Sequence, residues 1–478
     1  MTLWTASAAA AATGGDATAD WAATGVSIDT RTLAPGDLFV ALKDQRDGHD
    51  FVAQALEKGA AAALVTHRPN GVAEEAPLLI VDDVLAGLEA LGRAGRARMQ
   101  GKVAAVTGSV GKTSTKEMLL EMLRVQGRTH ASVASYNNHW GVPLTLARMP
   151  ADTEYAVIEI GMNHPGEIAP LSKMAQPHVA LITTVAAAHL EAFDDITGIA
   201  VEKASIYEGV VPGGIAVLNA DVDTAAILMA KAQDCQLRDI SFGAEGYDFK
   251  LIRADLRDDT TVVQAQMGAE QLLYKIASPG RHFAMNALGA LAVVAALRAD
   301  IALAVPALGR WRPYRGRGQR ERIHLDAIEP GMTLDLIDDS YNANPTSMAA
   351  ALDVLAAAPV TNDIGRVSRG RRIAFLGDMK ELGPDEIALH AGLSHLPSLQ
   401  SLDVVHCIGP LMRSLHDILP EAQRGDWFAT SEEALPMLKR RLDSGDVVLA
   451  KGSLSMKLGL IVDAIRKMGH APLDVEEG

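Results

Sequence analysis

The chain has 478 residues, more than one hydrophobic core usually organises, so two or three domains are expected. Hydrophobic residues make up 48% of it and charged residues 22%, which is typical of a globular protein and excludes a disordered or fibrous one. The formal net charge of -15 disfavours nucleic acid as a partner, because the overall electric field repels phosphates. Any phosphate-bearing ligand would have to be held by a local site.

The chain shows no export or membrane signal. No lysine or arginine precedes Arg31, so the basic region of a signal peptide is missing, and no run approaches 18 strongly apolar residues. The two cysteines, Cys235 and Cys407, lie in different segments and cannot form a C-x-x-C motif, which fits a reducing compartment. We therefore predict a cytoplasmic protein without disulfides or a membrane span, and we expect a monomer.

The first part of the chain predicts a small α/β module. Short strands are expected over 26–28 and 38–42, then a helix over 50–58 and an apolar strand within 60–65. We assign residues 1–98 to this first domain.

From Lys102 the pattern changes to a strand, a glycine-containing loop and a long helix. Further strands are expected over 156–160, 179–183 and 215–218. Apolar runs separated by helical stretches predict a mostly parallel sheet covered on both faces, and we assign residues 99–315 to this domain.

Six arginines lie among glycines and prolines between positions 310 and 322, which predicts either a hinge into a third domain or a solvated linker. Asn344 and Pro345 suit the N-cap and first position of a helix that runs to Ala357. Alternation of strands and helices predicts a doubly wound, Rossmann-like domain over 316–478. Its strands are expected over 333–337, 373–376, 404–408 and 447–450.

The loop after the Lys102 strand is the most informative segment, because it also opens a predicted helix over 114–125. Backbone N–H groups of such a loop and the helix N-terminus form a cradle for phosphates, with Lys112 reaching the terminal phosphates and Thr113 able to ligate magnesium. Val106 stands where a strict P-loop has its first glycine, so a helix-capping turn is the alternative. The predicted ATP-binding residues here are Thr107, Gly108, Ser109, Val110, Gly111, Lys112, Thr113 and Ser114.

Two further residues are placed to serve a metal. Ligands of open parallel sheets collect beyond the carboxyl ends of the strands, where Glu159 ends one strand and His189 follows another. With Thr113, this carboxylate and imidazole could hold a cation against nucleotide phosphates. The alternatives are a helix-capping acid for Glu159 and a hydrogen-bonded surface histidine for His189.

Taken with other segments in the same order, these motifs resemble the Mur ligases over nearly the whole chain. The segments are Lys112-Thr113-Ser114-Thr115-Lys116-Glu117, Asn137-Asn138 with Gly141-Val142-Pro143, Glu159-Ile160-Gly161, Asn163-His164-Pro165-Gly166-Glu167, Ala188-His189-Leu190-Glu191, Asp339-Ser340-Tyr341-Asn342-Ala343-Asn344, Gly377-Asp378-Met379 with Glu381-Leu382-Gly383, and Lys451-Gly452-Ser453. The resemblance implies an N-terminal UDP-binding module, a central P-loop ATPase domain and a C-terminal Rossmann-like domain.

Within the family, the resemblance is strongest to the branch that joins D-alanyl-D-alanine to UDP-N-acetylmuramoyl-tripeptide. It implies an ATP- and Mg2+-dependent amide ligase of peptidoglycan precursor synthesis that works through an acyl phosphate. The alternatives are another Mur-type or a folylpolyglutamate-type ligase and, from a different class, a P-loop NTPase switch that makes no bond. The stretch 378–383 lacks the Asn-Pro-Arg segment of the diaminopimelate-adding enzyme.

The resemblance also assigns roles to residues. Catalytic roles fall to Lys112, His189 and Lys203, where Lys203 stands at the position of a lysine that carbon dioxide converts to a carbamate able to ligate magnesium. The alternative for Lys203 is a salt bridge to Glu202. The implied metal ligands are Thr113, Glu159, His189 and Lys203 as its carbamate.

For the rest of ATP, the resemblance implies Asn286 at the adenine, although Phe283 replaces the first asparagine of the family's G-x-H-N-x-x-N segment. It implies Arg317 at the phosphates, unless that arginine is solvated, and Asp339 and Asn342 at the ribose and adenine. The UDP-linked substrate is assigned Thr30, Arg31, Gly48, His49, Asn137 and Asn138. For the first four of these, an ordinary turn is the alternative.

Overall fold

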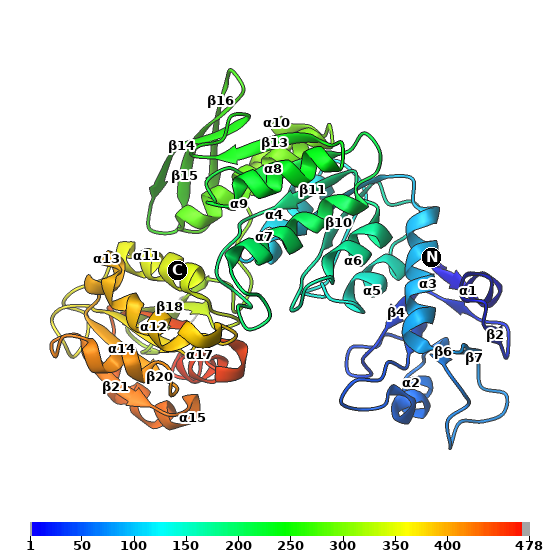
Figure 1. The fold of residues 1–478 in the computed structure, drawn as a ribbon. Coiled ribbons are helices and arrows are strands. Elements are labelled where there is room, and N and C mark those ends of the chain that lie inside the picture. The colour runs from blue at the N-terminus through cyan, green and yellow to red at the C-terminus, as the bar shows by residue number, and fades with distance from the viewer. Residues whose placement is uncertain (1, 471–478) are drawn as a thin grey trace, which may run out of the picture.

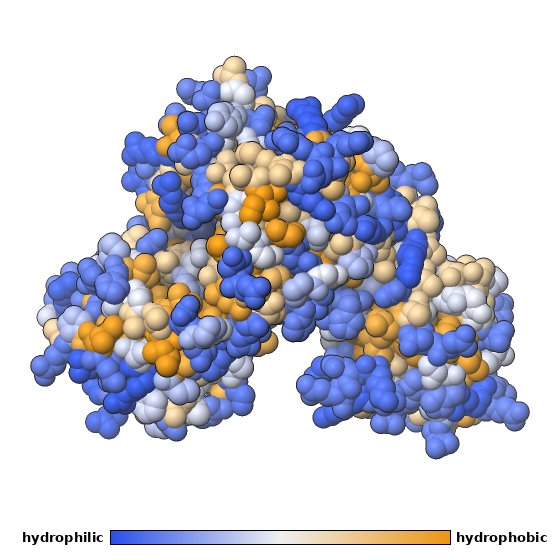
Figure 2. Space-filling view, in the orientation of Figure 1, coloured by the Kyte–Doolittle hydropathy of each residue, from blue (hydrophilic) through white to orange (hydrophobic). Residues whose placement is uncertain are grey.

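The computed structural model describes residues 2–470 and divides into three α/β units along the chain (Figure 1). The central unit lies between the other two, and the N-terminal and C-terminal units extend from it in the same direction, which gives the molecule an arched shape. The space-filling view shows the molecule hollowed beneath the central unit, between those two arms (Figure 2).

The N-terminal unit is built on a five-stranded sheet in the order β2-β7-β6-β5-β4, with a separate β1-β3 pair. The three predicted strands and the predicted helix of this region are confirmed as β4, β5, β6 and α2, with bounds that differ from the prediction by no more than two residues. Its strands are β1 Trp4–Thr5, β2 Asp16–Ala17, β3 Ala22–Ala23, β4 Gly25–Ser27, β5 Asp37–Val40, β6 Ala62–Val65 and β7 Leu78–Ile80. Its helices are α1 Ala6–Thr13, α2 Val52–Glu57 and α3 Val84–Arg98.

The central unit carries a nine-stranded sheet in the order β16-β15-β14-β13-β12-β11-β8-β10-β9. Its strands are β8 Lys102–Thr107, β9 Thr129–Ala131, β10 Tyr155–Glu159, β11 Val179–Ile182, β12 Ile215–Asn219, β13 Arg238–Gly243, β14 Phe249–Leu256, β15 Thr261–Met267 and β16 Glu270–Ile276. Its helices are α4 Lys112–Arg124, α5 Gly141–Ala147, α6 Ile168–Ala175, α7 Ile196–Ala204, α8 Ala225–Asp234, α9 Arg281–Ala296 and α10 Ile301–Leu308.

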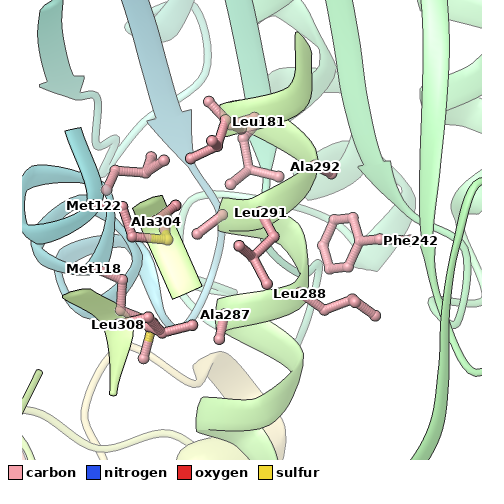
Figure 3. Close-up of a cluster of buried hydrophobic side chains, with 14 of the residues drawn as sticks. Met118, Met122, Leu181, Phe242, Ala287, Leu288, Leu291, Ala292, Ala304 and Leu308 are labelled. Atoms are coloured by element: carbon pink, nitrogen blue, oxygen red, sulfur yellow. The ribbon is translucent and has the colours of Figure 1, made fainter. Parts of the chain in front are cut away.

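Both faces of the central sheet are covered, as predicted. Helices α4, α9 and α10 pack on one face, where Met118, Leu291 and Leu308 are buried together with Phe242 of β13 (Figure 3). Helices α5 to α8 supply a second core on the opposite face. This burial fixes the strand β8 and the helix α4 relative to each other, so the loop between them has a rigid frame.

In the central sheet, the strands β9 and β13 and the three strands β14 to β16 were not predicted. β14, β15 and β16 form an antiparallel meander that extends the sheet beyond its parallel strands. β14 alternates between buried and exposed residues at its start, Phe249 and Leu251 being buried. Strands that are covered on one face only lack the continuous apolar runs from which the other strands were predicted.

The C-terminal unit has a six-stranded sheet in the order β17-β18-β22-β19-β20-β21, parallel except for β17, with helices on both faces. The predicted doubly wound pattern is confirmed. Its strands are β17 Gln319–His324, β18 Thr333–Asp339, β19 Arg372–Gly377, β20 Val404–Ile408, β21 Arg424–Phe428 and β22 Val447–Lys451. Its helices are α11 Pro345–Ala357, α12 Glu386–Gly392, α13 Pro397–Gln400, α14 Arg413–Ile418, α15 Ser431–Ala434, α16 Leu438–Arg441 and α17 Gly459–Arg466.

The helix α11 has the predicted bounds. The Asn344 side chain accepts a hydrogen bond from the backbone N–H of Ser347, and a reciprocal bond from the Asn344 backbone to the Ser347 hydroxyl completes a capping box. Pro345 stands at the first helical position, where its missing N–H costs nothing.

The predicted domain limits fall between elements. α3 ends at Arg98 and β8 begins at Lys102, while the third sheet begins with β17 at Gln319. We propose domains over 1–98, 99–315 and 316–478, of which residue 1 and residues 471–478 lie outside the described part of the chain. None of the helices in residues 2–470 has the length and apolarity that a bilayer crossing requires. Cys235 and Cys407 are free thiols.

Candidate active site

The loop between β8 and α4 has the shape of an anion cradle. Gly108 has φ +147°, and a Cβ there would overlap the hydroxyl of Thr183 on the neighbouring chain segment. That hydroxyl donates to the Val110 carbonyl at 2.6 Å, and Gly111, with φ +87°, is the N-cap of α4. No side chain caps α4, so its first N–H groups are open to a ligand.

A cavity of about 500 Å³ lies between this loop and the C-terminal unit. Most of the residues predicted for ATP and metal line it, and so do Asn137 and Asn138, which were predicted for the UDP-linked substrate. Those that line it are Ser109, Val110, Gly111, Lys112, Thr113, Ser114, Asn137, Asn138, Glu159, His189, Asn286, Arg317, Asp339 and Asn342. The predicted residues outside its lining are Thr30, Arg31, Gly48, His49, Thr107, Gly108 and Lys203.

Lys112 lies folded back onto its own loop. Its Nζ donates to the Gly108 carbonyl oxygen at 2.7 Å. Burial lowers the pKa of the Lys112 amine and the nearby Arg317 adds to this, while Glu159 opposes it. The amine is thus positioned at the loop by a single backbone acceptor, which an arriving phosphate could replace.

Glu159 lies at the centre of a polar cluster at the carboxyl end of β10. Its Oε1 accepts from the Thr113 hydroxyl at 3.1 Å and from the Asn137 amide at 2.7 Å. The side chain is fully buried, and its Oε2 has no hydrogen-bond partner among the described residues. A buried, unpaired carboxylate oxygen is costly, so this atom fits a cation or a donor supplied by a ligand.

His189 makes its polar contact with the C-terminal unit. Its Nδ1 lies 2.5 Å from Oε2 of Glu381, and this hydrogen bond holds the pKa of the Glu381 carboxyl below its usual range. Within residues 2–470, no three His, Cys, Asp or Glu side chains are grouped closely enough to hold a metal. The structure therefore joins Thr113 to Glu159 directly, and it ties His189 to a carboxylate that was not predicted.

Lys203 lies on α7 with 1% of its surface exposed. Its neighbour Glu202 instead accepts hydrogen bonds from the backbone N–H groups of Gly166, at 2.7 Å, and Ile168, at 2.9 Å. The alternative of a Lys203–Glu202 salt bridge is therefore not found among the described residues. Burial, with a smaller contribution from nearby Lys112, lowers the pKa of Lys203 well below its usual value.

The C-terminal unit presents a cation and an ion pair to the cavity. The Arg317 guanidinium donates to the Ser135 hydroxyl at 3.0 Å and lies 4.0 Å from the centroid of the Tyr341 ring, so it is not a solvated linker residue. Asp339 accepts from Lys451 Nζ at 2.7 Å, and burial raises the pKa of this carboxyl. Lys451 belongs to a quoted motif, but no role was predicted for it.

Asn286 lies on α9 beside the phosphate loop. A Cβ placed on Gly111 would stand 2.6 Å from Oδ1 of Asn286, so the two residues are in close contact. One turn earlier, His282 also lines the cavity, and burial lowers its pKa to about 4. The predicted contact of Asn286 with adenine stays a prediction.

Models of three Mur ligase domains match this chain. The "Mur ligase family, catalytic domain" matches residues 22–97, the "Mur ligase middle domain" matches 106–294, and the "Mur ligase, glutamate ligase domain" matches 326–454. The UDP-N-acetylmuramoyl-tripeptide--D-alanyl-D-alanine ligase of Escherichia coli is 35% identical over 449 residues, which are 93% of this chain and 94% of that protein. The chain belongs to the Mur ligase family.

Solved structures agree with this Mur ligase fold along nearly the full chain. A crystal structure of MurF from Acinetobacter baumannii is 31% identical with a TM-score of 0.81, covering 97% of this chain and 99% of that one. MurF ligase from Thermotoga maritima, solved in complex with ADP, is 26% identical with a TM-score of 0.75, covering 93% and 97%.

In this Mur ligase, four of the residues predicted for the UDP-linked substrate lie outside the cavity lining: Thr30, Arg31, Gly48 and His49. Arg31 forms an exposed ion pair with Asp29, with its Nη2 2.6 Å from Oδ2. His49 uses both ring nitrogens locally, Nδ1 with Asp47 at 2.6 Å and Nε2 with the backbone N–H of Thr66 at 3.0 Å. Their substrate role stays a prediction.

Sequence reasoning missed the residues that connect this Mur ligase site across its domains. Glu381 and Lys451 both belong to quoted motifs, and that was the only signal available for them. Tyr341, which lies against Arg317, also belongs to a quoted motif, whereas Ser135, which accepts a hydrogen bond from Arg317, gave no signal of its own. Each of these residues acts through a partner far away in the sequence, so only the fold identifies it.

Proposed function

We propose that this Mur ligase joins D-alanyl-D-alanine to UDP-N-acetylmuramoyl-tripeptide with ATP, through an acyl phosphate, in the synthesis of the peptidoglycan precursor. The observation that carries the proposal is the cavity in which the phosphate loop, Glu159 and the cationic residues of the C-terminal unit converge. The relatives named for this reaction match more than nine tenths of the chain. We place the reaction in the cytoplasm, where ATP and UDP-linked precursors are available.

In the first step, an oxygen of the tripeptide's terminal carboxylate attacks the γ-phosphorus of ATP, and ADP leaves with the bridging electron pair. Lys112 would transfer its hydrogen bond from the Gly108 carbonyl to the phosphates and offset the charge on the transferring group. Arg317, which reaches Ser135 from the start of the C-terminal unit, would approach the same phosphates.

In the second step, the amine of D-alanyl-D-alanine, having lost a proton, attacks the carbonyl carbon of the acyl phosphate. The tetrahedral intermediate collapses to the amide, and inorganic phosphate leaves with the oxygen that bridged carbon and phosphorus. Water would destroy the acyl phosphate, so the site must be covered while it exists. The C-terminal unit, which lines the cavity opposite the loop, is the element placed to cover it.

Mur ligases use Mg2+ with ATP, and the residues here fit the cation. The fully buried Oε2 of Glu159 has no hydrogen-bond partner among the described residues, and the Thr113 hydroxyl adjoins the same carboxylate. Oxygen donors of this kind suit Mg2+, and we propose Thr113, Glu159 and His189 as its ligands. When bound, the cation would neutralise charge on the phosphates.

We further propose that Lys203 carries the carbamate and serves the same site. The support is its burial without a salt bridge to Glu202, since a charged ammonium gains little there. The variant Lys203→Ala should lose most of its turnover, and a small added carboxylic acid should restore part of it by supplying the missing oxygens. Added acid should leave Lys112→Ala inactive. Equal rescue of both variants, or of neither, would contradict the assignment.

Product analysis tests the proposed function against its alternatives. The enzyme is supplied with ATP, Mg2+, UDP-muramoyl-tripeptide and D-alanyl-D-alanine, and mass spectrometry and phosphate release are measured with each substrate left out in turn. The proposal expects UDP-muramoyl-pentapeptide, and phosphate release that depends on the acceptor substrates. A different amine or acid in the product would indicate another Mur-type or folylpolyglutamate-type ligase. Rapid ATP hydrolysis indifferent to both substrates would indicate an NTPase switch.

A further inference from the structure

Two residues with left-handed backbone meet at the boundary between the central and C-terminal units. His189 has φ +60° and follows β11, and Glu381 has φ +65° and follows β19. Their side chains touch, with Nδ1 of His189 2.5 Å from Oε2 of Glu381. This backbone conformation is uncommon for residues other than glycine, and both partners of the contact adopt it.

The loops that carry these two residues also meet through their backbones. A Cβ on Gly383 would stand 3.4 Å from the carbonyl oxygen of Leu190, so the two turns lie in van der Waals contact. Glu381 therefore meets the central unit within a defined contact.

The two partners have different relations to the cavity. His189 lines it with 20% of its side chain exposed, whereas Glu381 does not line it. Because Nδ1 is engaged by the carboxylate, only Nε2 of His189 remains to face a ligand. This is the arrangement in which a carboxylate fixes the tautomer and the ring orientation of a histidine that binds a metal through its other nitrogen.

We propose that Glu381 is a positioning residue: it holds the proton on Nδ1 of His189, so that Nε2 is directed to bind Mg2+. This inference rests on the proposed function, in which His189 is a metal ligand. It adds that the metal site of the central domain is completed by the C-terminal domain. Affinity for the cation then depends on the C-terminal domain standing where the structure has it.

Metal binding tests this role separately from turnover. Mn2+ replaces Mg2+ as the probe, and free Mn2+ is measured by electron paramagnetic resonance with the full-length enzyme and a non-hydrolysable ATP analogue. We expect Glu381→Ala to weaken Mn2+ binding roughly 10- to 100-fold, the usual cost of removing such a carboxylate. Glu381→Gln keeps an acceptor oxygen without the charge and should lose less. Asp385→Asn, an exposed acid in the same segment, is the matched control and should bind like the wild type.

A purely structural contact between the domains would give a different pattern. It would lower the melting temperature of Glu381→Ala and leave Mn2+ affinity unchanged, and that result would overturn the proposal. A positioning role raises the KM for Mg2+, while kcat recovers at high Mg2+. Wild-type enzyme that binds no Mn2+ with the nucleotide analogue would remove the proposed function as well. If the wild type binds Mn2+ and turns over, and Glu381→Ala has the same Mn2+ affinity, only the role of Glu381 is contradicted.

Discussion

The central domain meets its two neighbours in different ways. Toward the N-terminal domain, α3 packs against α5 so closely that a Cβ on Gly95 would overlap the carbonyl oxygen of Leu146. Trp4 strengthens this contact, because its indole N–H donates to the Ala147 carbonyl at 2.9 Å. The backbone of α3 therefore packs directly against the backbone of α5, and this contact joins the two domains tightly.

Toward the C-terminal domain, several side-chain contacts beside the cavity are polar. They include the hydrogen bond from Arg317 to Ser135 and the ion pair of His189 with Glu381. Such contacts can separate one by one without disrupting a core. We therefore expect substitutions at the boundary with the N-terminal domain to lower stability, and substitution of Arg317 or Glu381 at the boundary with the C-terminal domain to lower activity.

Arg317→Ala should give the largest effect. Loss of a cation directed at the phosphates is expected to reduce kcat/KM for ATP by roughly 10²-fold, with the melting temperature nearly unchanged. Arg315→Ala is the matched control, because this neighbouring arginine is 65% exposed and pairs with Asp463 away from the cavity. It should stay within about twofold of the wild type. Equal losses in the two variants would contradict a specific role for Arg317 at the phosphates.

Gly95→Ala should give the next largest effect, on stability rather than rate. Alanine normally favours a helix over glycine, but here its Cβ must displace the α5 backbone, so we expect the free energy of unfolding to fall by roughly 1–3 kcal/mol. Gly392→Ala on α12, where nothing lies within 4 Å of an added Cβ, should be neutral or stabilising. Denaturant unfolding measures both, and a stable Gly95→Ala would show that the α3–α5 contact yields easily.

Tyr314→Phe should give the smallest effect. The phenol donates to Oε2 of Glu117 at 2.6 Å, and Glu117 keeps its ion pair with Lys116 after the phenol is lost. We expect the free energy of unfolding to fall by about 1 kcal/mol, with kcat nearly unchanged. Tyr247→Phe, at a position that is 88% exposed, should show no change in the same unfolding curves. A loss well above this value would show that this one hydrogen bond holds the segment that leads from the central domain into the C-terminal domain.

The parts of the fold that could be predicted are those whose structure is determined by residues close together in the sequence. The bounds of α11 follow from its Asn344-Pro345 cap, and the phosphate loop follows from a buried strand meeting a helix N-terminus. The meander β14–β16 was missed because its alternating pattern depends on which face of the sheet is covered.

The residues of the candidate site also fall into those that the sequence could predict and those that depend on contacts between distant segments. Lys112, Thr113 and Glu159 could be predicted because each stands at the end of an element whose place in a parallel sheet is known in advance. The contact between Glu381 and His189 could not, since it depends on how two domains are docked. Gly48 and His49 belong to a family motif, but the contacts of His49 in the structure include those of the local turn, in which the Asp47 carboxylate accepts from the His49 backbone. Their predicted role in substrate binding therefore stays a prediction.

The fate of one oxygen atom tests the central claim most directly. UDP-muramoyl-tripeptide is labelled with ¹⁸O in both oxygens of the reacting carboxylate, and the inorganic phosphate formed with ATP and D-alanyl-D-alanine is examined by mass spectrometry. Transfer through an acyl phosphate predicts one ¹⁸O atom in each phosphate released, and one in the new amide carbonyl. Phosphate that carries no label, released at the same rate, would show that ATP is hydrolysed by water and would contradict the account.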